Sequence, residues 1–159
     1  MKLSQKSLYF QRVLNMLYTT TIPLPYYKKN SKALFTTNVV RNAHHQTEAK
    51  FKREYGLKCA HALSDVPIST YTKLTLSYEL HLHLTRGKPI KADPMRGRVE
   101  KSLDLGNLLT YVDKTFSDVL TQLKILPDDS ISHIPQIHYY YKTIPDDEPE
   151  GIAVALELT

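Results

Sequence analysis

The sequence predicts an α+β domain, in which a small mixed or antiparallel sheet carries two main helices. Three observations predict it: a helical apolar period over 103–124, strict alternation over 73–84, and shorter alternating segments near both ends of the domain. With 159 residues, the chain has room for one compact domain. We place that domain at 16–159, with residues 1–15 as an N-terminal extension, so that Met16 is the start of the domain or an internal translation start.

The first part of the domain is predicted to contain a strand, a polar segment and a helix. Alternation in "LYTTTIPLP" predicts a strand at 17–23, which the two prolines end. Residues 26–45 show no sustained period and predict an exposed loop. Thr47 is expected to cap a helix over 47–63, in which apolar residues recur every three to four positions.

The strongest strand pattern is "KLTLSYELHLHL", where leucines and Tyr78 alternate with polar residues. Its apolar face must pack against another layer. His81 and His83 lie together on the polar face, where they either share a metal or are simply solvated.

The best helix is predicted over 103–124, capped by Ser102, with its apolar residues confined to an arc of about 120 degrees. This helix is expected to pack flat on the sheet. Strands are predicted at 137–142 and 151–159, and the acidic connection "TIPDDEPEG" between them is suited to a hairpin.

Composition excludes several classes of protein. A single cysteine, Cys59, excludes an internal disulfide and a zinc finger, and no stretch approaches the roughly 20 apolar residues of a membrane span. There is no Walker or Rossmann glycine loop, so we expect no nucleotide cofactor. These features fit a cytoplasmic protein. The acid-free start also resembles a mitochondrial targeting segment, and an organellar or ribosome-associated protein with a basic arm stays open as a third interpretation.

Positive charge gathers early in the chain. The net charge is +5, and seven of the 21 Lys and Arg residues precede Glu48, whereas none of the 16 acidic residues does. Such a segment either solubilises the protein or attracts a phosphate polymer. Basic residues of two predicted loops are candidates for DNA binding: Lys28, Lys29, Lys32, Arg41, Arg86, Lys88, Lys91, Arg96, Arg98 and Lys101.

Acidic residues on and after the long helix raise a second question. Lys114 and Asp118 stand four residues apart, which is the spacing of an ordinary surface ion pair, and Asn107 shares their stripe. Asp113 lies at the edge of the apolar arc, where a carboxylate needs a partner. Phosphodiester hydrolysis uses a divalent metal held by carboxylates, and a nearby lysine can stabilise developing charge. The residues alone are compatible with either interpretation.

The segment "DLGNLLTYVDKTFSDVL", followed by "PDDS", resembles the signature region of RusA-type Holliday-junction resolvases, including some phage-encoded members. By that resemblance, Asp104 corresponds to the first family carboxylate, Asn107 to the asparagine and Asp118 to the acid of Asp-x-Leu, while Asp128 and Asp129 match the Asp-Asp pair. The second carboxylate of Asp-x-Asp is Gly106 here. Lys114 stands one helical turn later than the family lysine, and Asp113 is placed to replace the missing acid.

The resemblance implies a Mg²⁺-dependent endodeoxyribonuclease that resolves Holliday junctions and other branched DNA in recombination and repair, with Mn²⁺ as a possible substitute. Metal would be held by Asp104, Asp113, Asp128 and Asp129, and Asp104, Asp113, Lys114 and Asp129 would be catalytic, supported by Asn107 and Asp118. The alternative is a catalytically degenerate DNA-binding protein of the same fold.

One geometric problem accompanies this expectation. A continuous helical path would separate Asp104 from Asp129 by about 30 Å. We therefore expect either a helix break near Thr110 or a site completed across a homodimer, which two symmetric cuts in a four-way junction also favour.

Overall fold

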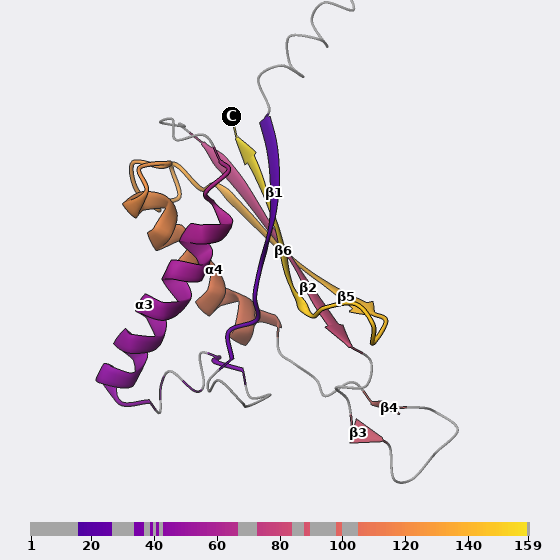
Figure 1. The fold of residues 1–159 in the computed structure, drawn as a ribbon. Coiled ribbons are helices and arrows are strands. Elements are labelled where there is room, and N and C mark those ends of the chain that lie inside the picture. The colour runs from indigo at the N-terminus through magenta and orange to yellow at the C-terminus, as the bar shows by residue number, and fades with distance from the viewer. Residues whose placement is uncertain are drawn as a thin grey trace, which may run out of the picture.

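The computed structural model describes residues 16–26, 34–36, 39, 41, 43–66, 73–83, 88–89, 98–99 and 105–158. Its main part is a four-stranded mixed sheet with two long helices on one side (Figure 1), so the predicted α+β class is confirmed. The elements are β1 Met16–Ile22, α3 His45–Ala62, β2 Leu74–His83, β3 Lys88–Pro89, β4 Arg98–Val99, α4 Leu105–Gln122, β5 Gln136–Ile144 and β6 Gly151–Leu158. The predicted extension 1–15 lies outside the described residues.

The strand order in the main sheet is β1-β6-β2-β5. β6 runs antiparallel to both β1 and β2, whereas β2 and β5 are parallel. A parallel pair needs a long crossover, and α4 belongs to the segment that connects β2 to β5. The separate β3–β4 pair lies away from this sheet (Figure 1).

The predicted hairpin between the last two strands is wrong, because β2 lies between β5 and β6. Their acidic connection instead crosses the end of β2. There the Glu150 carboxylate accepts a hydrogen bond from the His83 backbone N–H at 3.1 Å, and the His83 ring contacts the Glu148 carbonyl. A strand with a long, fully apolar face such as β2 is more stable in the interior of the sheet than at its edge. This stabilisation outweighs the tendency of β5 and β6 to pair directly across their short connection.

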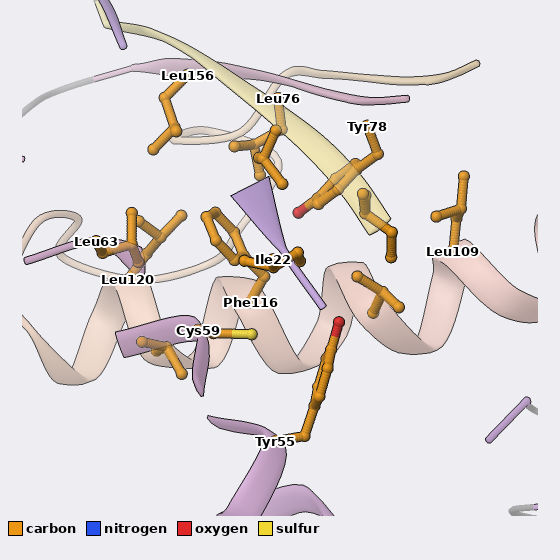
Figure 2. Close-up of a cluster of buried hydrophobic side chains, with 14 of the residues drawn as sticks. Ile22, Tyr55, Cys59, Leu63, Leu76, Tyr78, Leu109, Phe116, Leu120 and Leu156 are labelled. Atoms are coloured by element: carbon orange, nitrogen blue, oxygen red, sulfur yellow. The ribbon is translucent and has the colours of Figure 1, made fainter. Parts of the chain in front are cut away.

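The core lies between the sheet and the helices. In β2 the predicted apolar face from Leu74 to Leu82 is at most 4% exposed, while the residues between are half-buried. α4 places the predicted apolar arc against this face, and Figure 2 shows Phe116, Leu109 and Leu120 with Leu76 and Tyr78 in one cluster. α3 adds Tyr55 and Cys59 from below the same cluster in that view.

Two local expectations for α3 and the segment before it need correction. The helix begins at His45 and is capped by His44, whose ring nitrogen accepts from the Gln46 backbone N–H at 3.3 Å; Thr47 does not cap it. The segment before α3 was predicted to be an exposed loop, yet Leu34 and Phe35 are buried. The Phe35 ring stacks on Phe51 of α3 at a centroid distance of 4.0 Å, because a planar apolar ring gains more from this contact than from water.

Along the described ranges, no helix combines the length and apolar character that crossing a membrane requires.

Truncation of Phe116 tests the central packing contact. Phe116 is fully buried and meets Tyr78 edge-on, with ring centroids 5.9 Å apart. We expect Phe116→Ala to lower the free energy of unfolding by about 3–5 kcal/mol in urea denaturation, since it removes a large side chain and leaves a cavity. The control Leu57→Ala, at a position 68% exposed on α3, should change stability by about 0.5 kcal/mol or less. Equal losses would contradict the described core.

Candidate active site

Asp113 faces the sheet from the edge of the apolar face of α4. Its Oδ1 accepts a hydrogen bond from the Tyr78 hydroxyl at 2.8 Å and a second from the Ser117 hydroxyl at 3.3 Å. Tyr78 is fully buried within β2, and a buried phenol hydroxyl requires a polar partner. The carboxylate is therefore anchored from the centre of the sheet, and both of these bonds are made through Oδ1.

Lys114 lies beside Asp113 on the exposed side of α4 and joins two other acids. Its Nζ is 2.5 Å from Asp129 Oδ2 and 3.0 Å from Asp118 Oδ1. The second Asp118 oxygen contacts Lys52 of α3 at 2.5 Å. The expected surface pair of Lys114 and Asp118 thus exists, but it forms part of a network that includes an acid fifteen residues from Lys114 in the chain.

A tight reversal after α4 brings Asp129 back to the middle of the helix. Lys124 has a left-handed backbone with φ 59°, and the Ile125 N–H donates to the Leu120 carbonyl at 3.0 Å. Burial of Ile125 and Leu126 then holds the returning chain against the core. The reversal ends the helical path on which the 30 Å separation was based.

The expected break near Thr110 is wrong, because α4 continues from Leu105 to Gln122. The apolar face of α4 is continuous, so an unbroken helix buries all of it against β2. A break near Thr110 would expose part of this face and lose that stabilisation. Convergence of the acids comes instead from the turn that follows the helix.

Asp128 takes a different direction from Asp129. Its Oδ1 accepts the Ser130 backbone N–H at 2.8 Å and lies 2.9 Å from the His133 ring nitrogen. These bonds close the turn, and the Leu74 N–H donates to the His133 carbonyl at 2.8 Å, which ties the turn to the start of β2. The hydrogen bonds from Ser130, and then the contact with His133, lower the pKa of Asp128. This residue orders the turn that presents its neighbour.

The electrostatics of the two helix acids differ. Burial raises the pKa of Asp113 above the ordinary value of 3.8; the hydrogen bonds from Tyr78 and Ser117 oppose this rise, and the charge on Asp129 adds to it. Partial burial also raises the pKa of Asp118, but hydrogen bonds from Lys52 and Lys114 outweigh it and leave that pKa below the ordinary value. Asp113 is thus the acid whose charge the fold tolerates least.

The pKa of Lys114 is raised, first by its hydrogen bond to Asp129 and then by that to Asp118. The lysine therefore stays protonated at neutral pH. Its side chain is 59% exposed, so a phosphate from solvent can reach it. A fixed cation next to carboxylates is an arrangement that can act on a phosphodiester.

The structure brings together Asp113, Lys114, Asp118 and Asp129 from the predicted set, and it directs Asp128 elsewhere. Asn107 is half-buried in the first turn of α4, and Gly106 beside it is exposed. Asp104 lies outside the described residues. The same holds for most of the proposed DNA-binding residues: Lys28, Lys29, Lys32, Arg86, Lys91, Arg96 and Lys101.

Three other basic residues of that set belong to described positions. Arg41 is exposed, whereas Lys88 and Arg98 stand in β3 and β4 with side chains that are not described. The histidines on the polar face of β2 have separate partners, His81 with Glu79 and His83 with Glu150, so they do not share a site with each other.

The described residues around Lys114 provide only part of a ligand set for a divalent ion. Within the described part of the chain, no three His, Cys, Asp or Glu side chains gather closely enough to hold a metal. Mg²⁺, however, commonly uses only one or two carboxylates and completes its shell with water and substrate phosphate. Asp129 lies close enough to Asp113 for its charge to raise the pKa of Asp113, and both residues offer the hard oxygens that Mg²⁺ prefers.

Sequence reasoning missed the residues that support the site, namely Tyr78, Ser117 and Lys52. Tyr78 carried a usable signal, since it is the one residue with a hydroxyl in an otherwise leucine-rich strand face, and a buried hydroxyl predicts a polar partner opposite. Ser117 also follows Asp113 by four residues, the spacing of contacting helix neighbours. Lys52 gave no such signal, because its contact joins two helices.

A search against protein-family models and a search of curated proteins each found no match to this chain.

Replacing Asp113 by a neutral residue tests whether its ionisation lowers the stability of the folded protein. Because its pKa is raised on folding, ionisation costs stability as pH rises from 3.8 through the raised pKa. Asp113→Asn keeps an acceptor for both hydroxyls and carries no charge. The free energy of unfolding of the variant minus that of wild type should therefore rise across that pH window and stay constant above it. Urea unfolding of both proteins from about pH 3 to 8 measures this. A stability difference that does not change with pH, or that changes in the opposite direction, would contradict the buried position of the carboxylate.

Proposed function

We propose that this chain is a Mg²⁺-dependent, structure-selective endodeoxyribonuclease that cleaves Holliday junctions and other branched DNA. The single observation that carries the proposal is that Lys114 pairs with Asp129, whose charge also acts on Asp113, the residue next to Lys114 on α4. Two of these residues are neighbours on α4, and the third returns from the following turn. The motif that resembles RusA-type resolvases contains all three, and a RusA-like fold is part of the proposal.

In this proposal each residue has a distinct task. Asp113 and Asp129 would hold Mg²⁺, which supplies a bound water of lowered pKa and neutralises charge on the scissile phosphate. Tyr78 and Ser117 keep the Asp113 carboxylate oriented through Oδ1. Lys114, held by Asp118 and Asp129, offers its exposed ammonium to the phosphate.

Branched DNA is the proposed substrate because of the charge distribution. The basic residues of 28–41 and 86–101 would contact the phosphates of the DNA arms, where each neutralised phosphate releases counterions. A homodimer would present two such sites to a four-way junction, one for each of two symmetric cuts. We place this activity in the cytoplasm.

Adjacent aspartates offer a matched test of the site. Asp129→Asn should reduce Mg²⁺-dependent cleavage of a synthetic four-way junction by more than the roughly 10- to 100-fold that loss of an outer-shell partner costs. Asp128→Asn retains the acceptor for the Ser130 N–H, so its loss should be about tenfold or less. Linear duplex of the same sequence is the substrate control. Full activity in Asp129→Asn, or equal losses in both variants, would remove Asp129 from the chemistry.

A second candidate is a non-catalytic protein that binds branched DNA. It is favoured by Gly106, which stands where the resembled family has an acid, and by the incomplete ligand set among the described residues. It predicts salt-sensitive junction binding without cleavage in Mg²⁺ or Mn²⁺.

Restoring the acid separates the two candidates. Gly106 is exposed in the first turn of α4, which contains no acidic residue, so Gly106→Asp should be tolerated and should stabilise the helix by about 0.3–1 kcal/mol. If wild type binds but does not cut, and Gly106→Asp cuts, the degenerate candidate is correct. Cleavage by wild type in the same assay would exclude it.

A further inference from the structure

α4 covers β2 but leaves part of the neighbouring strand β5 exposed on the same side of the sheet. The parallel register pairs Leu76 with Ile137 and Leu80 with Tyr141, so these side chains share a face. The two β2 leucines are fully buried, whereas Ile137 is 41% and Tyr141 is 38% exposed. We call the helix-side surface formed by Ile137, Tyr139 and Tyr141 the β5 ledge.

The β5 ledge adjoins the candidate active site directly. Tyr139 pairs with Tyr78 in the sheet, and their ring centroids are 6.0 Å apart. Burial and then the charge on Asp113 raise the pKa of Tyr139, and its hydrogen bond with Thr110 of α4 opposes that rise. The central ring of the ledge therefore lies within electrostatic reach of the carboxylate, and Tyr141 lies two residues further along the strand.

The chemistry of β5 suits nucleic acid bases. The strand contains three consecutive tyrosines and no acidic residue, and Lys142 is its one charged side chain. Exposed aromatic rings stack on bases of any sequence, at about 1–3 kcal/mol per base. A strand whose phosphate lies at Lys114 would have a base face available for this surface only where base stacking is interrupted, as it is at the branch point of an open four-way junction.

The opposite face of β5 is a poorer candidate. There Tyr140 is 51% exposed, but it lies beside Glu79 in the register and its ring stacks on His138. None of the residues assigned to the active site lies on that face. Tyr140 and Tyr141 are thus neighbours in the chain, but only Tyr141 lies on the face of β5 that adjoins the candidate active site.

We propose that the β5 ledge, through Tyr141, stacks on base faces exposed at a branch point, next to the phosphate that Lys114 contacts. The inference rests on the proposed function for its ligand, branched DNA, but it does not require cleavage. It would give selectivity for structure over sequence, since every base has a face that stacks, while a linear duplex buries these faces and a branch point exposes them.

Affinity measurements with the full chain test the ledge. A fluorescent four-way junction is titrated in EDTA, so that no cleavage occurs, and binding is followed by anisotropy. Tyr141→Ala should weaken binding by about 5- to 150-fold, which corresponds to the stacking of one base. Tyr141→Phe keeps the ring and should bind within about twofold of wild type, as should Tyr140→Ala on the other face.

A unique fluorophore tests the contact itself. The chain contains no tryptophan, so Tyr141→Trp and Tyr140→Trp each introduce a single indole, on opposite faces of β5. Junction binding should quench the indole at position 141, and should leave that at position 140 unchanged. Equal effects at the two positions, or binding without quenching at position 141, would overturn the proposal.

The remaining outcomes separate the ledge from the chemistry. Quenching at position 141 by a protein that never cuts in Mg²⁺ would support the ledge and refute the nuclease. Normal binding and cutting by Tyr141→Ala would refute the ledge alone. If Tyr141→Ala changes the oligomeric state in size-exclusion chromatography, the exposed strand serves a second copy of the chain and the proposal fails.

Discussion

The hydrogen bond from the Tyr78 hydroxyl to Asp113 joins the core of this protein to its candidate site. Tyr78 is the largest fully buried side chain in β2, packed edge-on against Phe116. Its ring packs in the apolar layer, and its hydroxyl lies at the boundary between the apolar and the polar face of α4. The position of the carboxylate is therefore set by the same contact that fixes the helix on the sheet. Small shifts in that packing would move the carboxylate with it.

The burial of Asp113 opposes stability, as shown by the direction in which its pKa moves. A fold optimised for stability alone would place a neutral residue at the edge of this arc, and sites retained at a cost in stability are typical of function. Asp118, by contrast, is compensated by two lysines and resembles a structural ion pair. The two acids of one helix are thus distinguished by burial and partners, although they are the same residue type.

The order of strands produces both the site and the surface beside it. With β2 inside the sheet, α4 covers its apolar face, and β5 is left at the edge, where α4 contacts Tyr139 but leaves Ile137 and Tyr141 exposed. A hairpin between β5 and β6 would have displaced Tyr139 from Asp113. The parallel crossover through α4 instead brings helix, reversal and edge strand together. The resulting neighbours include a lysine, carboxylates and exposed tyrosines, groups that suit the phosphates and the bases of one nucleic acid strand.

The sequence by itself determined the elements, because their apolar periods are local. Alternation defined β2, a continuous arc defined α4, and both were located to within a few residues. The same pattern indicated that Asp113 needed a partner and that Lys114 and Asp118 would meet. Motif resemblance added Asp129, but no local pattern separated it from Asp128, since adjacent acids differ only in the bonds that the turn gives them.

Only the tertiary structure decided how these elements combine. Strand order depends on which apolar faces must be buried together, and that competition overrode the short connection that predicted a hairpin. The reversal at Lys124 returned Asp129 to the side of the helix, beside Lys114, whereas a continuous helical path would have carried it further along the helix axis. The roles of Tyr78, Lys52 and the β5 ledge could not be predicted from the sequence for the same physical reason. Contacts between distant segments are set by packing, and the period of any one segment does not determine that packing.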